Sequence, residues 1–538
     1  MRWVVSILVL LLALGCSRQE PLTGLEPPPD ETPVFGDTFI EGSIGDASTL
    51  LPVLASDGAS SEINGLVYSG LVRYDGDLNI VGELAESWDI SPDNLSITFH
   101  LRHGVKWHDG VPFTSADVLY TYQVYRDPET PTSYAESYLQ VQKAETPDAY
   151  TFRVTYAEPY APALISWGFS VLPKHLLEGK KITESPLARH PIGTGPYCFV
   201  EWQGGEKIVL EANRDYFEGS PYIKRFVFRI IPDTSTQFLE LQTGGLDYMG
   251  LTPIQYDRQT DTPAFHRLFT KYSYLAFGYT YLGYNLKRPL FQDRRVRQAL
   301  SYAIDKQEII DGVLLGHGRI ATGPYKPDAW VYNPKVKRYN FDPEKAKALL
   351  AEAGWRDSDG DGILDKDGKP FRFTIITNQG NDLRSKTGEI IQRRFHDIGI
   401  DVKLRIIEWA TFLKEFINPS NFDATILGWS GGPEPDQYNI WHSSKIGPRQ
   451  LNFIGYKNPE VDELLEKGRR TFDQEERKKI YGRFQEILAE DQPYTFLYVG
   501  EALPAVASRF HGIEPKPGGI RYNFTQWYVP RELQKFSR

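Results

Sequence analysis

Short apolar segments and amphipathic segments alternate along the chain from about residue 36 onward. β-branched and aromatic residues, several of them alternating with polar ones, predict strands at 96–101, 207–210, 226–231 and 371–376. Apolar residues at helical spacing predict helices at 382–399, 459–470 and 473–490. A further helix is predicted from the N-cap acid Asp342 and Pro343 to Gly354. This alternation predicts a large α/β protein, and periodicity alone assigns it no function.

The first residues differ in character from the rest of the chain. Arg2 precedes an apolar run, Trp3 to Gly15, that is too short to span a bilayer core of roughly 30 Å. A positive start, a short apolar run and small residues at its end are typical of a secretory signal, placed at 1–15. The proline-rich, acidic segment that completes 16–35 predicts an extended tether. No other apolar run approaches transmembrane length, so we expect a mature protein outside the cytoplasm.

Composition narrows the classes of protein that remain. The 538 residues correspond to three or four domains at about 150 residues each. Hydrophobic residues make up 41% and charged residues 24%, as in folded soluble proteins. A net charge of -10 argues against nucleic-acid binding, which usually needs a basic surface. The two cysteines, Cys16 and Cys198, are too few for a disulfide framework or a thiolate zinc site.

Signals for an enzyme are weak. The sequence contains no His-Glu-x-x-His pair. His108 stands beside Asp109, but Asp109 and Gly110 predict a tight turn between strands, so we interpret His108 as a turn histidine. We therefore expect a protein without enzymatic activity, and a secreted hydrolase is the alternative.

One acidic turn has the spacing of a calcium loop. Acids stand at positions 1, 3, 5 and 9, glycine stands at position 6, and Ile363 at position 7 would offer its carbonyl. The candidate ligands are Asp357, Asp359, Asp361, Ile363 and Asp365. Gly368 occupies position 12, where a calcium loop has a bidentate glutamate. A structural Ca²⁺ and a plain acidic turn both remain open, and no other cofactor is expected.

A series of motifs, in a fixed order along the chain, indicates a protein family. They are LAESW at 84–88, GVKWHDGVPFTSADV at 104–118, GTGPY at 193–197, NRDYF at 213–217, FLELQTG at 238–244 and DRRVRQAL at 293–300. Together they resemble the signature of the family 5 extracellular solute-binding proteins, the peptide- and nickel-binding components of ABC importers. The resemblance covers essentially all of residues 36–530.

The resemblance implies a two-lobed periplasmic-binding-protein fold, α/β in class, of the class II, cluster C type, with an extra α/β domain inserted in the first lobe. Carried onto this sequence, the first lobe would comprise 36–64, 191–284 and 505–538, the additional domain 65–190, and the second lobe 285–504. In such a protein the two lobes close on a ligand about a hinge. The implied function is capture of di- or oligopeptides and their delivery to a membrane permease.

The resemblance also implies a binding cleft. Trp409 and Trp429 match tryptophans that line the family's peptide pocket, and Gly428 and Ser430 flank the second of them. Gly58, Ala59, Tyr284, Asn285 and Tyr498 match other cleft-lining regions. The aspartate that pairs with a ligand's α-ammonium in well-known peptide binders is replaced here by Gly432. Glu434 and Asp436 are the nearest acids and become the candidate anchors, with a rigid surface loop as the alternative.

Partners and location follow from the same resemblance. Leu14-Gly15-Cys16 resembles a bacterial lipobox, although Ala13 and Leu14 leave its register one residue off, and it implies that Cys16 is lipidated. The expected protein is a monomeric lipoprotein of the periplasm or cell envelope, anchored to a membrane by an N-terminal lipid such as palmitate. Its partners would be a peptide and the permease and ATPase subunits of an importer, with no nucleic acid. Nickel complexes, haem, opines and sugars remain alternative cargoes.

Overall fold

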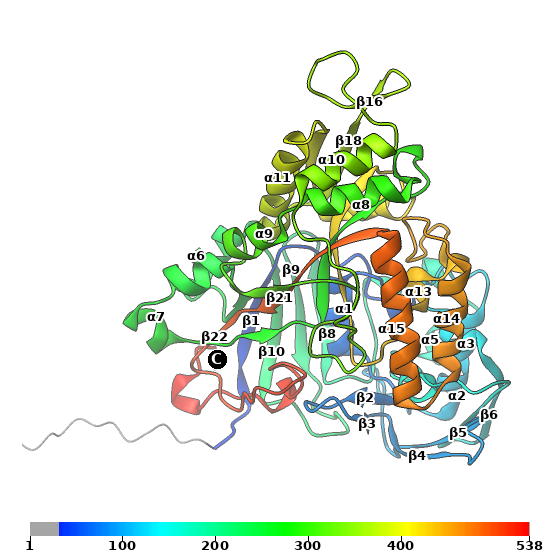
Figure 1. Cartoon of the computed structure of the whole chain (residues 1–538). Helices are drawn as coiled ribbons and strands as arrows, with labels where there is room; N and C mark the ends of the chain where they lie inside the picture. The colour runs from blue at the N-terminus through cyan, green and yellow to red at the C-terminus, as the bar shows by residue number, and fades with distance from the viewer. Residues whose placement is uncertain (1–31, 537–538) are drawn as a thin grey trace, which may run out of the picture.

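The computed structural model of the protein describes residues 32–536 (Figure 1). The expected signal peptide and Cys16 lie outside the described residues. Within residues 32–536, no helix combines the length and the apolar character that crossing a bilayer requires. Three larger sheets organise this part of the chain, and we call the regions built on them the first lobe, the second lobe and the additional domain.

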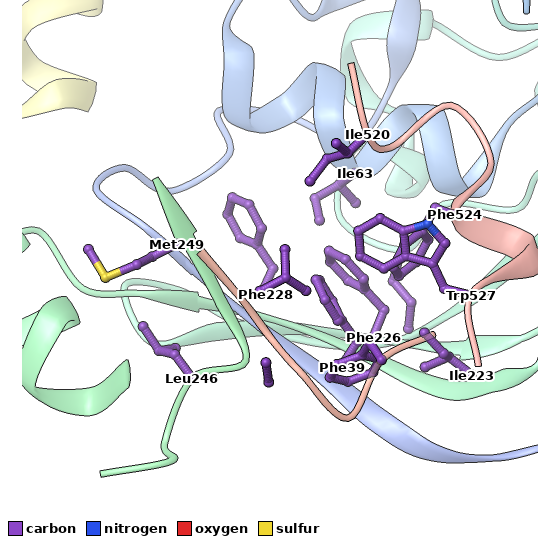
Figure 2. Close-up of a cluster of buried hydrophobic side chains, with 14 of the residues drawn as sticks. Phe39, Ile63, Ile223, Phe226, Phe228, Leu246, Met249, Ile520, Phe524 and Trp527 are labelled. Atoms are coloured by element: carbon purple, nitrogen blue, oxygen red, sulfur yellow. The ribbon is translucent and has the colours of Figure 1, made fainter. Parts of the chain in front are cut away.

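The first lobe is built on a mixed seven-stranded sheet whose central strand, β1, runs parallel to its neighbours β10 and β11. Phe39 and Phe226 face each other across β1 and β10 and belong to one buried cluster, which also contains Trp527 from the end of the chain (Figure 2). In order across the sheet the strands are β12 (Phe269–Lys271), β22 (Pro504–Ala507), β11 (Tyr248–Gly250), β1 (Gly36–Ser43), β10 (Ile223–Ile230), β9 (Lys207–Ala212) and β8 (Tyr197–Gln203). Helices α1 (Gly58–Val67), α6 (Thr234–Gln242) and α7 (Pro263–Leu268) complete this lobe.

The second lobe contains a sheet that is buried on both faces. Along β14, Leu282 and Tyr284 contribute to one core cluster while Tyr279 and Tyr281 contribute to another, as the period of two in a strand requires. Its strands are β13 (Tyr274–Leu275), β21 (Tyr494–Ala502), β14 (Gly278–Tyr284), β20 (Ala424–Ser430), β18 (Arg372–Asn378) and β19 (Asp401–Ile407), with β15 (Gly318–Ile320) paired to β21. One face packs against α8 (Arg294–Ala303), α10 (Pro343–Glu352) and α11 (Asp382–His396), and the other against α14 (Pro459–Arg470) and α15 (Gln474–Asp491). Helix α9 (Lys306–Gly312) lies beside β15.

The additional domain has a four-stranded antiparallel sheet and its own core. In order its strands are β4 (Ala85–Ile90), β5 (Ser96–Leu101), β7 (Thr151–Tyr156) and β6 (Val141–Asp148). Helix α2 (Ser115–Arg126) packs on this sheet, and α3 (Glu136–Leu139), α4 (Ala163–Ser166) and α5 (Lys174–Leu177) are short. A separate hairpin joins β2 (Val72–Tyr74) to β3 (Ile80–Gly82). In Figure 1 this domain lies at the lower right and the helices α8, α10 and α11 at the top.

The predicted elements are present with small shifts at their ends. The four predicted strands are β5, β9, β10 and β18, and the four predicted helices are α10, α11, α14 and α15. Asp342 caps α10 by accepting from the backbone N–H of Lys345, and Gly354 follows the helix at φ +91°, where a side chain is disfavoured. The α/β class and the two-lobed fold expected from the sequence are confirmed.

The predicted turn at Asp109 and Gly110 is also present, and it explains His108. Gly110 has φ +88°, and its N–H donates to the carbonyl of Trp107. His108 accepts from the N–H of Gly193 at Nδ1 and contacts the carbonyl of Gly195 at Nε2. Burial lowers the pKa of His108, which favours the neutral ring that this pattern needs. The histidine therefore joins the additional domain to the first lobe.

The chain passes between the two lobes twice. Residues 272–273 separate β12 of the first sheet from β13 of the second, and only Leu503 separates β21 from β22. The two connections lie side by side, because Tyr272 N–H donates to Pro504 O and Ser273 Oγ donates to Glu501. We take this pair of short connections as the hinge between the lobes that the sequence implied. Strand β14 lies in the second sheet, so the first lobe ends before this strand and not at residue 284 as expected.

Candidate functional site

A cavity of about 330 Å³ lies where the two lobes and the additional domain meet. The additional domain contributes Leu78 from the β2–β3 turn, and the C-terminal part of the first lobe contributes Pro517. The second lobe supplies the rest of the wall, from three segments at 277–279, 324–331 and 429–440. A site built from all three regions changes shape when they move, as a ligand cleft at a domain interface does.

Several aromatic side chains line this wall, among them Trp429, whose role in binding stays a prediction. Its indole Nε1 donates to Tyr494 Oη at 3.3 Å, and its ring packs against Phe453 at 5.8 Å between centroids. The aromatic residues of the wall are Phe277, Tyr279, Tyr325, Trp330 and Trp429. Lys326 adds a charge, with Nζ 3.6 Å from the ring centroid of Phe277. Apolar walls with a few fixed polar groups are typical of sites for small ligands.

Three neighbours of Trp429 leave open backbone at the cavity. Ser430, Gly431 and Gly432 line it, and a Cβ added at either glycine would meet no atom within 4 Å. Gly428 to Gly432 has the spacing Gly-x-Ser-x-Gly, but Ser430 ends a strand and does not sit on a strand-to-helix elbow. Within residues 32–536 no hydrogen bond joins the Ser430 hydroxyl to a histidine. This segment therefore offers backbone groups and space, and it lacks a catalytic serine arrangement.

Glu434 and Asp436 point away from the cavity. Pro433, Pro435 and Gln437 line the wall, and neither of the two acids between them is part of it. Glu434 forms an ion pair with Arg477, and Asp436 Oδ2 lies 2.7 Å from Arg469 Nη2. Burial raises the pKa of Glu434 despite the charge of Arg477. The anchor role stays a prediction, and an ammonium group would have to share carboxylates that already have cationic partners.

Trp409 lies at the contact between the two lobes and does not line the cavity. A Cβ added to Gly45 of the first lobe would lie 3.3 Å from Trp409 Cδ1. Nearby, Thr234 at the start of α6 donates to Asp382 at the start of α11, at 2.7 Å. These contacts bring the lobes together at α12 (Trp409–Thr411) and α11. Gly58 and Ala59 begin α1 in the first lobe, also outside the cavity wall.

Three of the expected cleft residues are buried instead. Tyr284 is 0% exposed, and its hydroxyl lies 2.8 Å from Thr495 Oγ1 in the core of the second lobe. Asn285 is 1% exposed and donates to the carbonyls of Ser420 and Phe422. Tyr498 is 4% exposed in β21. Tyr284 and Asn285 thus hold the second lobe together, a position that the motif match could not distinguish from the cleft.

Arg384 is a residue that motif matching missed. It stands in the first turn of α11, beside the carboxyl ends of β18 and β20, where α/β sheets bind their ligands. Its Nη1 donates to Asn378 Oδ1 at 2.8 Å, while Nε is enclosed without a partner. Among residues 32–536, no carboxylate lies within ion-pair distance of it, and its enclosure lowers the pKa of the guanidinium. Gly428 makes room for it, because a Cβ there would lie 2.8 Å from Nη2.

A buried ion network joins the additional domain to the second lobe. Glu136 of α3 lies 2.8 Å from Lys445 Nζ and 3.8 Å from Arg469 Nη1, and all three side chains are at most 12% exposed. The N–H of Ala161 donates to the carbonyl of Arg469 at 2.6 Å. Burial would raise the pKa of Glu136, but the hydrogen bond and charge of Lys445 and the charge of Arg469 hold it below its ordinary value. This network connects the additional domain to Asp436, beside the cavity.

A second polar contact spans the hinge. His317, in the second lobe, lies 2.9 Å from Asp257 of the first lobe through Nε2 and 2.9 Å from Glu501 through Nδ1. Burial alone would lower the pKa of His317, but the hydrogen bonds and charges of Glu501 and Asp257 raise it. The charged imidazolium can donate to both carboxylates at once, whereas the neutral ring can donate to only one.

The acidic turn brings three of its carboxylates together. Oxygens of Asp357, Asp359 and Asp361 lie within 4.8 Å of one another, on exposed side chains. Asp365 instead accepts from the N–H and hydroxyl of Ser358. The set fits a hard cation in ligand type, but calcium usually needs six to eight oxygen ligands. Calcium binding stays a prediction.

Cys198 is half-buried in β8 and is not disulfide-bonded. Burial, with the charges of Glu211 and Asp215, raises the pKa of its thiol to about 11. A thiol held in its neutral form is a poor nucleophile. Cys198 therefore lacks the thiolate character that a reactive cysteine needs.

Comparisons with known proteins agree with this geometry. The family model described as bacterial extracellular solute-binding proteins, family 5 Middle, matches residues 79–448. Oligopeptide-binding protein AppA of Bacillus subtilis is 37% identical over 541 residues, 98% of each chain. The structure of that protein in complex with a nonapeptide has a TM-score of 0.88 and 36% identity, covering 92% of this chain and 99% of that one. NikZ from Campylobacter jejuni in complex with Ni(L-His) has a TM-score of 0.83 and 30% identity, covering 91% and 99%.

Proposed function

The chain belongs to the bacterial extracellular solute-binding proteins of family 5, and from this membership we propose that it captures peptides for an ABC importer. Members of this family bind a solute and work with permease and ATPase components. The similarity to an oligopeptide-binding protein and to its nonapeptide complex supports a peptide as the cargo. The role requires binding and release, and no chemical step by this chain.

The observation that carries the proposal is the cavity shared by both lobes and the additional domain. Its aromatic wall suits side chains of varied shape, and the open backbone at Gly431 and Gly432 suits an extended main chain. Recognition through backbone hydrogen bonds tolerates different sequences, because every peptide has the same main chain. A site of this kind favours peptides as a class over one particular peptide.

Arg384 supports an anionic group on the cargo. A cation in the first turn of a helix is disfavoured by the helix dipole, and enclosure adds the cost of lost hydration. A ligand carboxylate at Arg384 would compensate both costs with charge-assisted hydrogen bonds. The start of α11 also contacts the first lobe through Asp382 and Thr234, so a ligand bound there would favour closure.

We further propose that the protein works at the outer face of a membrane, held by a lipid on Cys16. The support is the short apolar run before Gly15-Cys16 and the proline-rich segment after it, which would let the folded part reach a permease. Mass spectrometry of the membrane-extracted protein tests this directly. A mature chain that begins at Cys16 with an acyl modification is expected, and an unmodified cysteine would overturn it.

Native mass spectrometry of the purified protein is the test of the cargo. A bound mass that disappears on denaturation and fragments as peptides is expected. A nickel complex or haem in its place would keep the binding role and overturn the peptide assignment.

The contribution of Arg384 can be tested with Arg384→Met, using Lys386→Met, an exposed position on the same helix, as control. A hydrogen bond to a charged group contributes about 1.5–3 kcal/mol, so the first variant should bind the identified peptide roughly 10- to 150-fold more weakly. Because the variant removes an uncompensated cation, the ligand-free protein should melt no lower than the parent. Unchanged affinity in Arg384→Met would remove the carboxylate contact and leave the binding role intact.

A further inference from the structure

A second cavity of about 330 Å³ lies in the second lobe, at the start of α9. It shares no residue with the cavity between the lobes. The segment 320–332 nevertheless contributes to both, with residues 320–322 and 332 on this side and residues 324–326 and 328–331 on the other. The remaining wall comes from 305–307, 337–341, Gln492 and Phe496.

Lys306 is the distinctive residue of this cavity. Its side chain lines the cavity although the residue is only 9% exposed. Within residues 32–536, no hydrogen bond or ion pair reaches its Nζ. Burial lowers the pKa of the amine to about 8, and no nearby carboxylate offsets this effect. Because Nζ opens only to the cavity, the ammonium group has little room for hydration, and an anion bound in the cavity would stabilise it.

The charges around Lys306 make the cavity cationic. Lys337 and Arg338 also line it, and Lys337 is matched by Glu490 at 3.4 Å. Arg338 is exposed and forms no ion pair within the described residues. Asp305 is the one acidic residue of the wall, and its carboxylate accepts from the N–H of Glu308 as the cap of α9. Lys306 and Arg338 therefore remain without a compensating anion.

The rest of the wall offers polar and apolar surface in separate places. Asn340 and Thr322 provide neutral polar groups, whereas both polar atoms of the Gln492 side chain are hydrogen-bonded within the lobe. Tyr339, Phe341 and Phe496 provide ring surface. A volume of about 330 Å³ leaves room for more than an inorganic ion. The cavity thus combines a buried cation, a second cation and aromatic surface.

We propose that this cavity binds a small organic anion, with a carboxylate or phosphate group on Lys306 and an apolar part against the rings. Arg338 attracts the anion, and Lys306 holds its charged group inside. This site is separate from the cargo cleft and shares no lining residue with it. Because 320–332 lines both cavities, an anion bound here fixes one wall of the cargo cavity.

The test uses benzoate, phenyl phosphate and inorganic phosphate as probes at constant ionic strength. Binding to the folded protein should raise its melting temperature with probe concentration. Lys306→Met should weaken the response roughly tenfold or more, since a charge-assisted hydrogen bond is lost. Lys335→Met, an exposed lysine beside the same segment, is the matched control and should respond like the parent.

A second measurement follows Lys306 in the unaltered protein, so a poorly folded variant leaves the test intact. The amine is acetylated with acetic anhydride, and the labelled lysines are quantified by peptide mass spectrometry. Bound benzoate or phenyl phosphate should protect Lys306 and leave Lys335 labelled at its original rate. Equal labelling of Lys306 with and without all three probes would overturn the proposal. So would a Lys306→Met protein that responds to the probes like the parent.

Discussion

Removing the charge of Glu136 should weaken cargo binding although this residue lies outside the cargo cavity. Glu136 belongs to the additional domain, and its partners Lys445 and Arg469 belong to the second lobe. The contact exists when these regions are together, so it favours the closed arrangement. In the open form the same side chains would be hydrated, so the substitution would cost that form no free energy. Glu136→Gln should therefore shift the balance towards the open form.

The expected size of this effect follows from burial. Glu136 is 12% exposed at its side chain and Lys445 10%, with 2.8 Å between the charged atoms. Removing one partner of a fully buried pair costs about 3–5 kcal/mol. Glutamine keeps one hydrogen-bond acceptor, so the loss should be nearer the 1.5–3 kcal/mol of a hydrogen bond to a charged group. At about 1.4 kcal/mol for each factor of ten, affinity should fall roughly 10- to 150-fold.

The same two regions offer a matched control. Glu158 and Arg470 form an ion pair at 2.6 Å, with side chains 61% and 54% exposed. Exposed pairs contribute about 0–1 kcal/mol, so Glu158→Gln should leave affinity within a few-fold of the parent. Isothermal titration calorimetry with the co-purified peptide measures both variants. If Glu136→Gln and Glu158→Gln bind alike, the buried network does not contribute to closure and the reasoning fails.

Three further outcomes are expected. His317 has a raised pKa, so its charge stabilises the hinge contact below its ordinary pKa, and this stability is lost as pH rises through the raised value. The difference in melting temperature between the parent and His317→Gln should therefore shrink from pH 5.5 to 8.5. A constant difference would contradict this reasoning. The double change Glu434→Gln, Asp436→Asn should destabilise the protein by about 1.5–3 kcal/mol or more in urea, because Arg477 loses its carboxylate partner and Arg469 keeps only Glu136 at 3.8 Å. If the two acids anchor a ligand's ammonium group, the affinity ratio between a free and an N-acetylated peptide should fall to one in that variant. An unchanged ratio would show that they are not the anchors. Calcium titrated into chelator-treated protein should bind at the acidic turn with a dissociation constant no lower than about 10⁻⁴ M, since the bidentate ligand is missing. Tighter binding that is abolished by Asp359→Asn would show a complete calcium site.

Local patterns predicted the elements well because the forces that set them are local. Asp342 with Pro343 fixed the start of α10, and the alternation at 96–101 gave β5 without error. The motif match placed Trp429 and Ser430 at the cavity, since both stand at the end of one strand. It also named Tyr284 and Asn285, which the structure places in the core of the second lobe, 0% and 1% exposed and outside the cavity wall. Their ligand-binding role stays a prediction.

Other features of the site depend on residues that are distant in sequence. Sequence position gives no indication that Glu434 and Asp436 face Arg477 and Arg469. The same holds for Arg384, whose surroundings depend on where β18 and β20 end beside helix α11.

By itself, the sequence determined the α/β class, the family, and four of the strands and four of the helices. It did so because helix caps, turns and apolar periodicity act over a few residues, and because ordered motifs extend over most of the chain. Tertiary structure alone decided which charges are compensated. Glu136 pairs with Lys445, which lies 309 residues further along the chain, whereas Arg384 and Lys306 have no anionic partner within residues 32–536. Ion pairing depends on the distance between charged groups in the folded protein and on how deeply they are buried. The two cations without an anionic partner are therefore the positions where we expect ligands to bind.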